Sequence, residues 1–108
     1  MVSEKELEVE DELLHGYELV LIISPEVAEE KMGTVIDGVT QYITTNGGTI
    51  VDVEQWGRRK LAYAIRHFLE GNYVLIRFKL RPEFTRGLKA NLHISENFLR
   101  HLLVKLDD

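Results

Sequence analysis

The segment YVLIRFKL, residues 73–80, alternates strictly between two kinds of side chain. Its even positions are all apolar: Val74, Ile76, Phe78 and Leu80. Its odd positions end in two cations: Tyr73, Leu75, Arg77 and Lys79. A period of two is typical of a half-buried β-strand. We therefore expect a strand whose even side lies in the core, with Arg77 and Lys79 on the opposite face.

Outward from this strand, three other segments read as β-structure. Residues 17–24 are apolar on both sides, which indicates a central strand. Residues 49–56 alternate, and Gly57 can bend the chain so that the strand continues through LAYAIR. FLEGN, residues 68–72, is expected to contain the following turn. Residues 98–106 form the last strand.

Two segments have the apolar spacing of helices. The first is expected to begin with Ser24 as N-cap and Pro25 in the first turn, and to run to about Thr45. The second opens at Pro82 and places apolar residues every four positions. The order is β-α-β-β-α-β. Right-handed crossovers then place both helices on one face of the sheet and leave the other face open.

The sequence thus predicts an α+β, ferredoxin-like domain over residues 17–106, with a four-stranded antiparallel sheet and two helices on one face. Residues 1–16 carry six acids against one lysine and are expected to be a disordered tail.

The composition excludes several classes of function. The 108 residues contain no cysteine, so disulfides, thiolate zinc sites and cysteine nucleophiles are excluded. No apolar run is long enough to span a bilayer. The four histidines are scattered without metal-ligand spacing, and no serine has a recognisable His–acid arrangement. We expect a cytoplasmic protein that is not an enzyme and has no metal or cofactor.

Charge is unevenly distributed along the chain. The net charge is −5, yet residues 57–106 hold eleven of the thirteen lysines and arginines against three glutamates. This asymmetry indicates either a polyanion partner for the basic half or two halves whose charges pair in space. The charge pattern by itself favours neither.

The candidate binding residues are the cations and one aromatic residue of the basic half. They are Arg58, Arg59, Lys60, Arg66, Tyr73, Arg77, Lys79, Arg100 and Lys105. The triplet in WGRRKLAYAI is either a solvated turn or a place where an anion binds, and the Leu61, Ala62 and Tyr63 that follow are assigned to packing. Cations beside an aromatic side chain suit phosphate contact with base stacking. The alternative is a solvated face that resists edge aggregation.

A family resemblance rests on four blocks of the chain. These are YELVLIISP, NGGTIVDVEQWGRRKLAY, GNYVLIRF and LRHLLVK, which span residues 17–106. In this order and spacing the chain resembles the bacterial small-subunit ribosomal protein six family. The resemblance implies a non-enzymatic protein of the ribosome. It also implies a heterodimer with small-subunit ribosomal protein eighteen that binds the central domain of small-subunit ribosomal RNA.

A second function belongs to a different class. Many ferredoxin-like domains are regulatory modules that oligomerise and bind a small ligand between subunits. The strongly basic segment argues against an uncharged metabolite.

Overall fold

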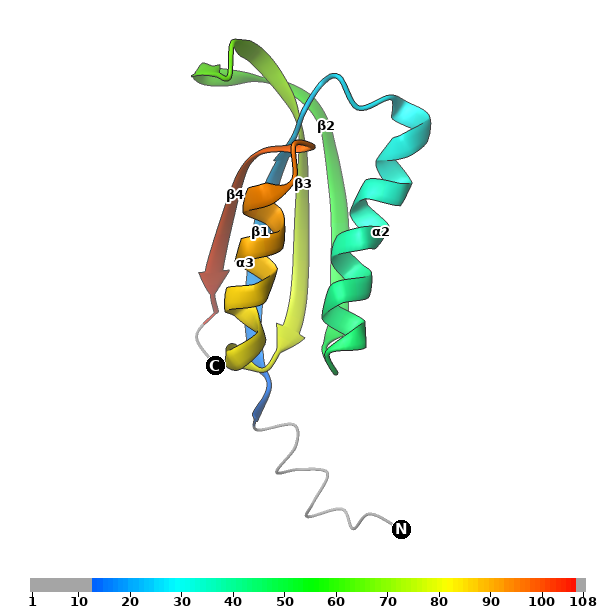
Figure 1. The fold of residues 1–108 in the computed structure, drawn as a ribbon, viewed down its shortest axis with the longest axis vertical. Helices are drawn as coiled ribbons and strands as arrows, with labels where there is room; N and C mark the ends of the chain where they lie inside the picture. The colour runs from blue at the N-terminus through cyan, green and yellow to red at the C-terminus, as the bar shows by residue number, and fades with distance from the viewer. Residues whose placement is uncertain (1–12, 107–108) are drawn as a thin grey trace.

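The computed structural model describes residues 13–106, so most of the predicted acidic tail lies outside the described residues. Residues 13–106 form four strands and two α-helices, in the predicted order (Figure 1). The elements are β1 (His15–Ile23), α2 (Glu29–Thr45), β2 (Thr49–Ile65), β3 (Phe68–Leu80), the 3-10 helix η1 (Pro82–Phe84), α3 (Thr85–Ile94) and β4 (Phe98–Lys105).

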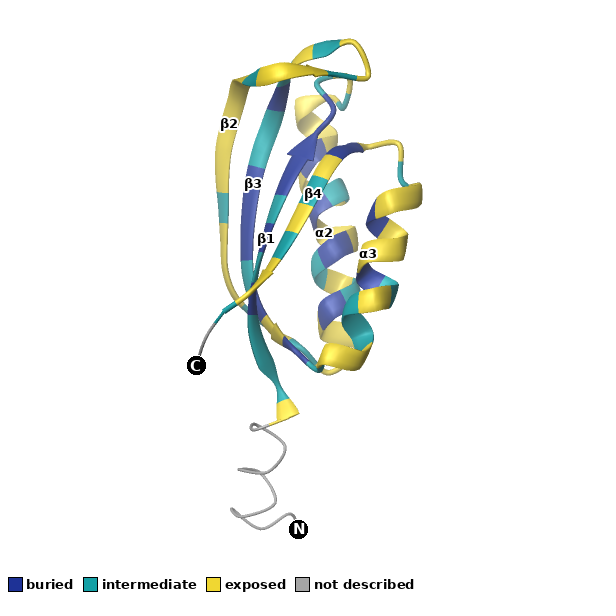
Figure 2. Cartoon of the chain, turned by 90° about the vertical axis from the view of Figure 1, so that its left-hand side faces the viewer, coloured by how far each residue is buried: buried dark blue, intermediate teal, exposed yellow. Residues whose placement is uncertain are grey.

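The four strands form one antiparallel sheet in the order β2-β3-β1-β4. Both helices pack on the same side of it, as Figure 2 shows in a view turned by 90° from that of Figure 1. The predicted ferredoxin-like fold is confirmed. We call the side of the sheet away from the helices the open face.

The core lies between the sheet and the two helices. Strand β3 contributes the even side of YVLIRFKL: Val74, Ile76, Phe78 and Leu80 are each at most 1% exposed. Helix α2 adds Met32, Ile36, Val39 and Ile43, and α3 adds Leu88 and Leu92. The ring of Phe78 stacks on that of Tyr17 with 5.6 Å between centroids. Arg77 and Lys79 lie on the open face, so the predicted alternation is confirmed.

The β2–β3 hairpin extends beyond the rest of the sheet. The pairing of β1 with β3 reaches only to Asn72, so residues 58–71 project as a two-stranded ribbon, which we call the arm. Figure 2 shows the arm bending across the end of the sheet. Arg100 of β4 donates a hydrogen bond to the hydroxyl of Tyr63 in β2. The arm therefore reaches past the end of β1 to β4.

The arm end of the open face is itself packed. Ile22, Leu75 and Leu99 are only 5–7% exposed, although they are not part of the core under the helices. Gly71 approaches them closely, because a Cβ there would lie 2.4 Å from Ile22 Cγ2. The sheet therefore buries apolar side chains on both faces at this end.

Three predicted boundaries were wrong. Strand β1 begins at His15, because Gly16 pairs with Lys79 instead of ending a tail. Helix α2 begins at Glu29, since the Ser24 hydroxyl accepts a hydrogen bond from the Glu26 N–H within a separate turn.

The third wrong boundary is the hairpin turn, which was expected within FLEGN. Ile65 pairs with Phe68, so the turn consists of Arg66 and His67. Both have positive φ, 49° and 71°. Two consecutive positive φ values are the requirement of the tight hairpin turn that matches strand twist.

Replacement of Phe78 by alanine tests the core assignment. We expect Phe78→Ala to lower the free energy of unfolding by roughly 3–5 kcal/mol, because a fully buried aromatic ring is replaced by a cavity. The measurement is denaturant-induced unfolding. Lys79→Ala on the adjacent exposed position is the matched control and should stay within about 0.5 kcal/mol of wild type. A loss in Phe78→Ala as small as that in Lys79→Ala would contradict the burial of Phe78 in the core.

Two histidines meet where α3 packs on β4. The rings of His93 and His101 are edge to face, with 6.4 Å between centroids. Burial lowers the pKa of His101 below its ordinary value, and the charges of His93 and Lys89 lower it further. In the unfolded chain this pKa returns to about 6.5. The unfolded state therefore binds more protons in the window between the two values.

We expect this difference to destabilise the protein as the pH falls below about 6.5. The stability loss between pH 7 and pH 5.5, measured by denaturant titration, should be smaller in His101→Gln than in wild type. His93→Gln should show an intermediate loss, because it removes one of the charges that oppose protonation. An identical pH dependence in wild type and His101→Gln would contradict the assignment.

Candidate nucleic-acid interface

The basic triplet lies on the first strand of the arm, and strand alternation divides it between two sides. Arg58 pairs with Asn72 and Lys60 pairs with Glu70, whereas Arg59 pairs with Gly71. Gly71 packs toward Ile22 on the open face, so Arg59 lies on that side. Arg58 and Lys60 lie on the side of the helices. All three side chains are exposed, and each can contact a ligand that approaches its own side of the ribbon.

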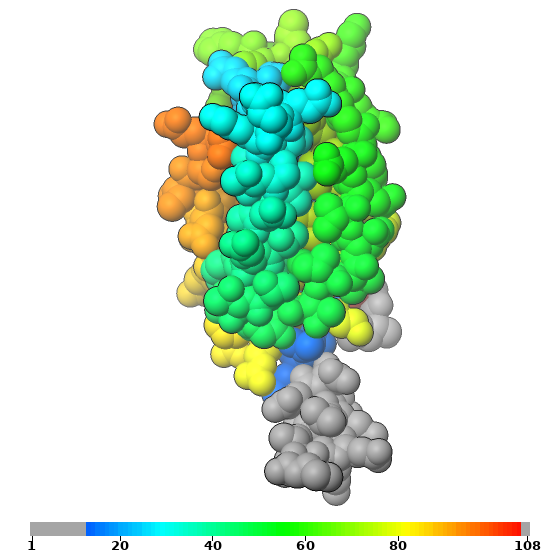
Figure 3. Space-filling view, turned by 90° about the vertical axis from the view of Figure 1, so that its right-hand side faces the viewer, coloured from blue at the N-terminus to red at the C-terminus, as the bar shows by residue number. Residues whose placement is uncertain are grey.

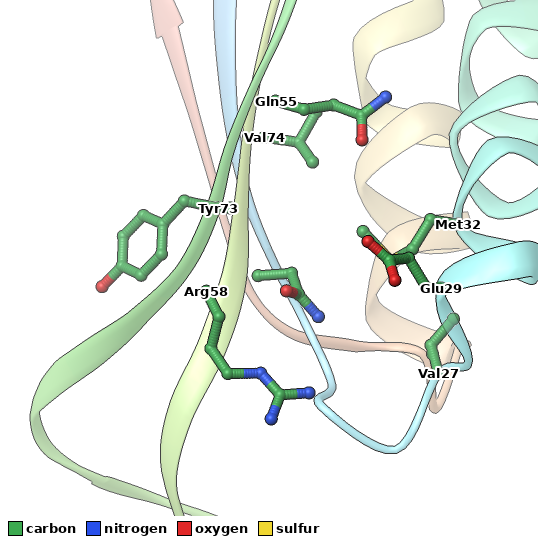
Figure 4. Close-up of a pocket in the computed structure, with 9 residues that line it drawn as sticks. Val27, Glu29, Met32, Gln55, Arg58, Tyr73 and Val74 are labelled. Atoms are coloured by element: carbon green, nitrogen blue, oxygen red, sulfur yellow. The ribbon is translucent and has the colours of Figure 1, made fainter.

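Arg58 lines a cleft of about 320 Å³ between the start of α2 and the adjoining strands. In Figure 4 its guanidinium and the Gln55 amide point toward the helix, and the Glu29 carboxylate faces them from α2. Arg58 Nη2 donates a hydrogen bond of 3.3 Å to the carbonyl oxygen of Pro25. Its Nη1 lies 4.0 Å from a Glu70 carboxylate oxygen. Figure 3 shows this side of the molecule, with α2 along the middle and β2 beside it.

A cross-strand row joins the arm to the far edge of the open face. Gly57 pairs with Tyr73, Tyr73 with Ile22, and Ile22 with Arg100. Figure 4 shows the Tyr73 ring pointing away from the helices. The row places Arg100 on the open face. The hydroxyl of Tyr63 hydrogen bonds to Arg100 while 61% of the residue stays exposed, so its assignment to packing was wrong.

Arg77 is surrounded by carboxylates. Its guanidinium forms ion pairs with Glu18 at 3.1 Å, Asp52 at 3.1 Å and Glu54 at 3.0 Å. The hydrogen bond to Glu18 is the main reason that the pKa of Arg77 is raised above its ordinary value. We call Glu18, Asp52 and Glu54 the acidic cluster. Three negative charges surround one positive charge, so this part of the open face attracts cations.

The other candidate cations lie apart. Lys79 is exposed on the open face beyond Arg77. Arg66 lies at the tip of the arm. Lys105 pairs with Tyr17, whose ring faces the helices, so Lys105 lies on the helix side. The nine candidates therefore do not form a single patch: Arg59, Tyr73 and Arg100 come together at the arm end of the open face.

The sequence left open whether the basic half pairs with the acidic half or faces a polyanion partner, and the structure shows such pairing at Arg77. Arg77 pairs with three acids that precede residue 57. Among residues 13–106, Arg59, Lys60, Arg66 and Arg100 form no ion pair. Hence the cations of the arm and of the adjoining β4 remain available to an anionic ligand.

Trp56 is a residue that the candidate set omitted. It is 42% exposed, and the Arg59 guanidinium lies 5.5 Å from the centroid of its ring. The signal was present in the sequence, because a tryptophan directly before Gly57 and three cations joins an aromatic ring to a basic segment.

Two other kinds of site were sought in the described part of the chain. Residues 13–106 contain no group of three or more His, Asp or Glu side chains placed to hold a metal ion. Within the same residues no helix is long and apolar enough to cross a membrane.

The sequence is similar to those of known ribosomal proteins. The family model for ribosomal protein S6 matches residues 16–105. Small ribosomal subunit protein bS6 of Dehalococcoides mccartyi is 36% identical over 108 residues, which cover all of this chain and 99% of the relative. The bS6 protein of Clostridioides difficile is 40% identical over 91 residues, covering 84% of this chain and 98% of the relative.

A solved structure of a ribosomal protein S6 has the same fold. The crystal structure of 30S ribosomal protein S6 from Thermotoga maritima superimposes with a TM-score of 0.82 and 30% sequence identity, covering 86% of this chain and 88% of that one. The family match extends from the first residues of β1 to the end of β4, and so includes the arm and the open face. The chain belongs to the ribosomal protein S6 family, whose members are proteins of the small ribosomal subunit.

Proposed function

We propose that this protein binds the central domain of small-subunit ribosomal RNA in the cytoplasmic ribosome, as a heterodimer with small-subunit ribosomal protein eighteen. The observation that carries the proposal is the arm. It projects from the folded body and exposes Arg58, Arg59 and Lys60 to solvent. Family membership supports RNA as the polyanion and a non-enzymatic role in the subunit.

Electrostatics favours the arm as the place of RNA contact. A phosphate backbone is attracted to cations that have no internal partner, and the arm supplies them on both sides of a thin ribbon. The acidic cluster around Arg77 repels phosphate from the opposite end of the open face. RNA is therefore directed to the arm and away from the acidic cluster.

The partner protein would reduce the electrostatic repulsion between this chain and RNA. The chain carries a net charge of −5, which opposes the approach of RNA. A small basic partner offsets this charge, and the acidic cluster offers it a complementary surface. The cleft at Arg58 is compatible with the alternative of a small-ligand module, but the family match favours the ribosomal role.

The cations of the arm are tested by changing Arg58, Arg59 and Lys60 together to alanine. Each phosphate neutralised contributes about −0.7 (single strand) to −0.9 (duplex) to the slope of log K against log salt. If two or three of the side chains touch phosphate, the slope should flatten by roughly two units. The measurement is filter binding of this protein with its partner to a central-domain RNA fragment at several salt concentrations.

A matched control removes three cations elsewhere. Arg81, Arg86 and Lys89 near α3 are changed to alanine, which alters the net charge by the same amount without touching the arm. This variant should keep the wild-type slope. Both triple variants should keep the wild-type melting temperature, because exposed cations contribute little to folding. Equal slopes in the arm variant and wild type would leave the triplet as a solvated strand and refute its role in RNA contact.

Dependence on the partner is a separate prediction. Without the partner, the RNA affinity of this chain should be weak, because its net negative charge repels RNA and few phosphate contacts form. Adding the partner at a fixed salt concentration should strengthen binding. Equal affinity with and without it would argue against a joint RNA-binding unit.

A further inference from the structure

The tryptophan at the base of the arm is placed by a β-bulge. Gln55 pairs with Val74, and the next pair is Gly57 with Tyr73, so Trp56 is an extra residue on β2. Gly57 has a φ of +83°, which an L side chain rarely adopts. Arg59 lies on the open face and its guanidinium lies over the Trp56 ring, so Trp56 lies on that face as well. Trp56 is 42% exposed there, a large apolar area for a position on an edge strand.

Charge and aromatic character coincide around this side chain. The Arg59 guanidinium lies over the indole, 5.5 Å from its centroid. The cross-strand row begins beside Trp56 at Gly57 and continues through Tyr73, whose ring also points to the open face (Figure 4). The same row ends at Arg100. Two aromatic rings and two arginines with no ion pair among residues 13–106 thus lie on this row or beside it at the arm end.

This combination selects the chemistry of a ligand. An indole with a guanidinium over it offers a planar surface of high polarisability beside positive charge. Arg100 adds a further cation, and the acidic cluster lies at the other end of the open face. The complementary ligand has a flat aromatic group joined to an anionic backbone, which is an unpaired nucleotide of single-stranded RNA.

We propose that Trp56, flanked by Arg59 and Tyr73, is a stacking site for one unpaired base of the bound RNA. The proposal rests on the proposed RNA-binding function and adds a contact of a different kind, since stacking neutralises no phosphate. The two contacts therefore have different salt signatures. Loss of the arm cations changes the salt slope, whereas loss of the Trp56 ring lowers affinity equally at every salt concentration.

The direct test uses the fact that Trp56 is the only tryptophan of the chain. Binding of the central-domain RNA fragment to the heterodimer should quench Trp56 emission to saturation, with the same midpoint as filter binding. The heterodimer carrying Trp56→Phe provides the background signal from the partner. An oligomer of eight adenosines at low salt should also quench the emission, and an eight-base-pair duplex should quench it less.

Affinity is measured in parallel. Trp56→Leu should weaken binding of the RNA fragment on the order of tenfold with an unchanged salt slope, since base stacking on an aromatic ring has about this effect. Trp56→Phe should retain most of the affinity. Leu69→Ala is the matched control, because Leu69 is an exposed apolar residue of the arm outside the row, and it should bind like wild type.

Three results would overturn the stacking site, and they separate it from the proposed function. Wild-type affinity in Trp56→Leu, together with weakened binding in the arm triple variant, would leave RNA binding intact without stacking at Trp56. A change of Trp56 emission on adding the partner alone, with none on adding RNA, would assign the indole to the protein interface. Absence of any RNA binding by the wild-type heterodimer would remove both proposals.

Discussion

At the arm end, the central strands β1 and β3 carry apolar side chains on both faces, and the rest of the molecule is arranged around the need to bury them. The helices cover one face through the apolar side of β3. At the arm end, the other face is covered because the hairpin folds back against Ile22 and Leu99. This return depends on a missing side chain at Gly71, where a Cβ would lie 2.4 Å from Ile22 Cγ2. The path of the arm therefore depends on the same contacts that bury the apolar side chains of the open face.

The same path divides the open face electrostatically. At one end the arm gathers Arg59 and Arg100 beside aromatic rings. At the other end the three carboxylates around Arg77 exceed its charge. Such a dipolar surface orients a polyanion before any contact forms, since each end favours one sign of charge. Two ligands of opposite charge can then occupy one sheet without competing for the same side chains.

Local patterns in the sequence were sufficient for the element order and the buried side of β3, because alternation and helical spacing are properties of neighbouring residues. The hairpin turn was misplaced because Gly71 looks like a turn residue, whereas its small size is needed for packing and the turn falls at Arg66 and His67. The ion-pair partners of Arg77 could not be predicted from the sequence either. Glu18 and Asp52 come from two other strands, and only the register brings them to one guanidinium.

The irregular pairing of β2 also affects the protein before it reaches any partner. β2 is an edge strand of 17 residues, long enough to act as a template for a strand of another molecule. Its register with β3 shifts three times, and its outer half carries consecutive cations. Bulges and charged side chains both disfavour edge-to-edge association of sheets. The bulge that exposes Trp56 thus also disfavours edge-to-edge association of newly made chains.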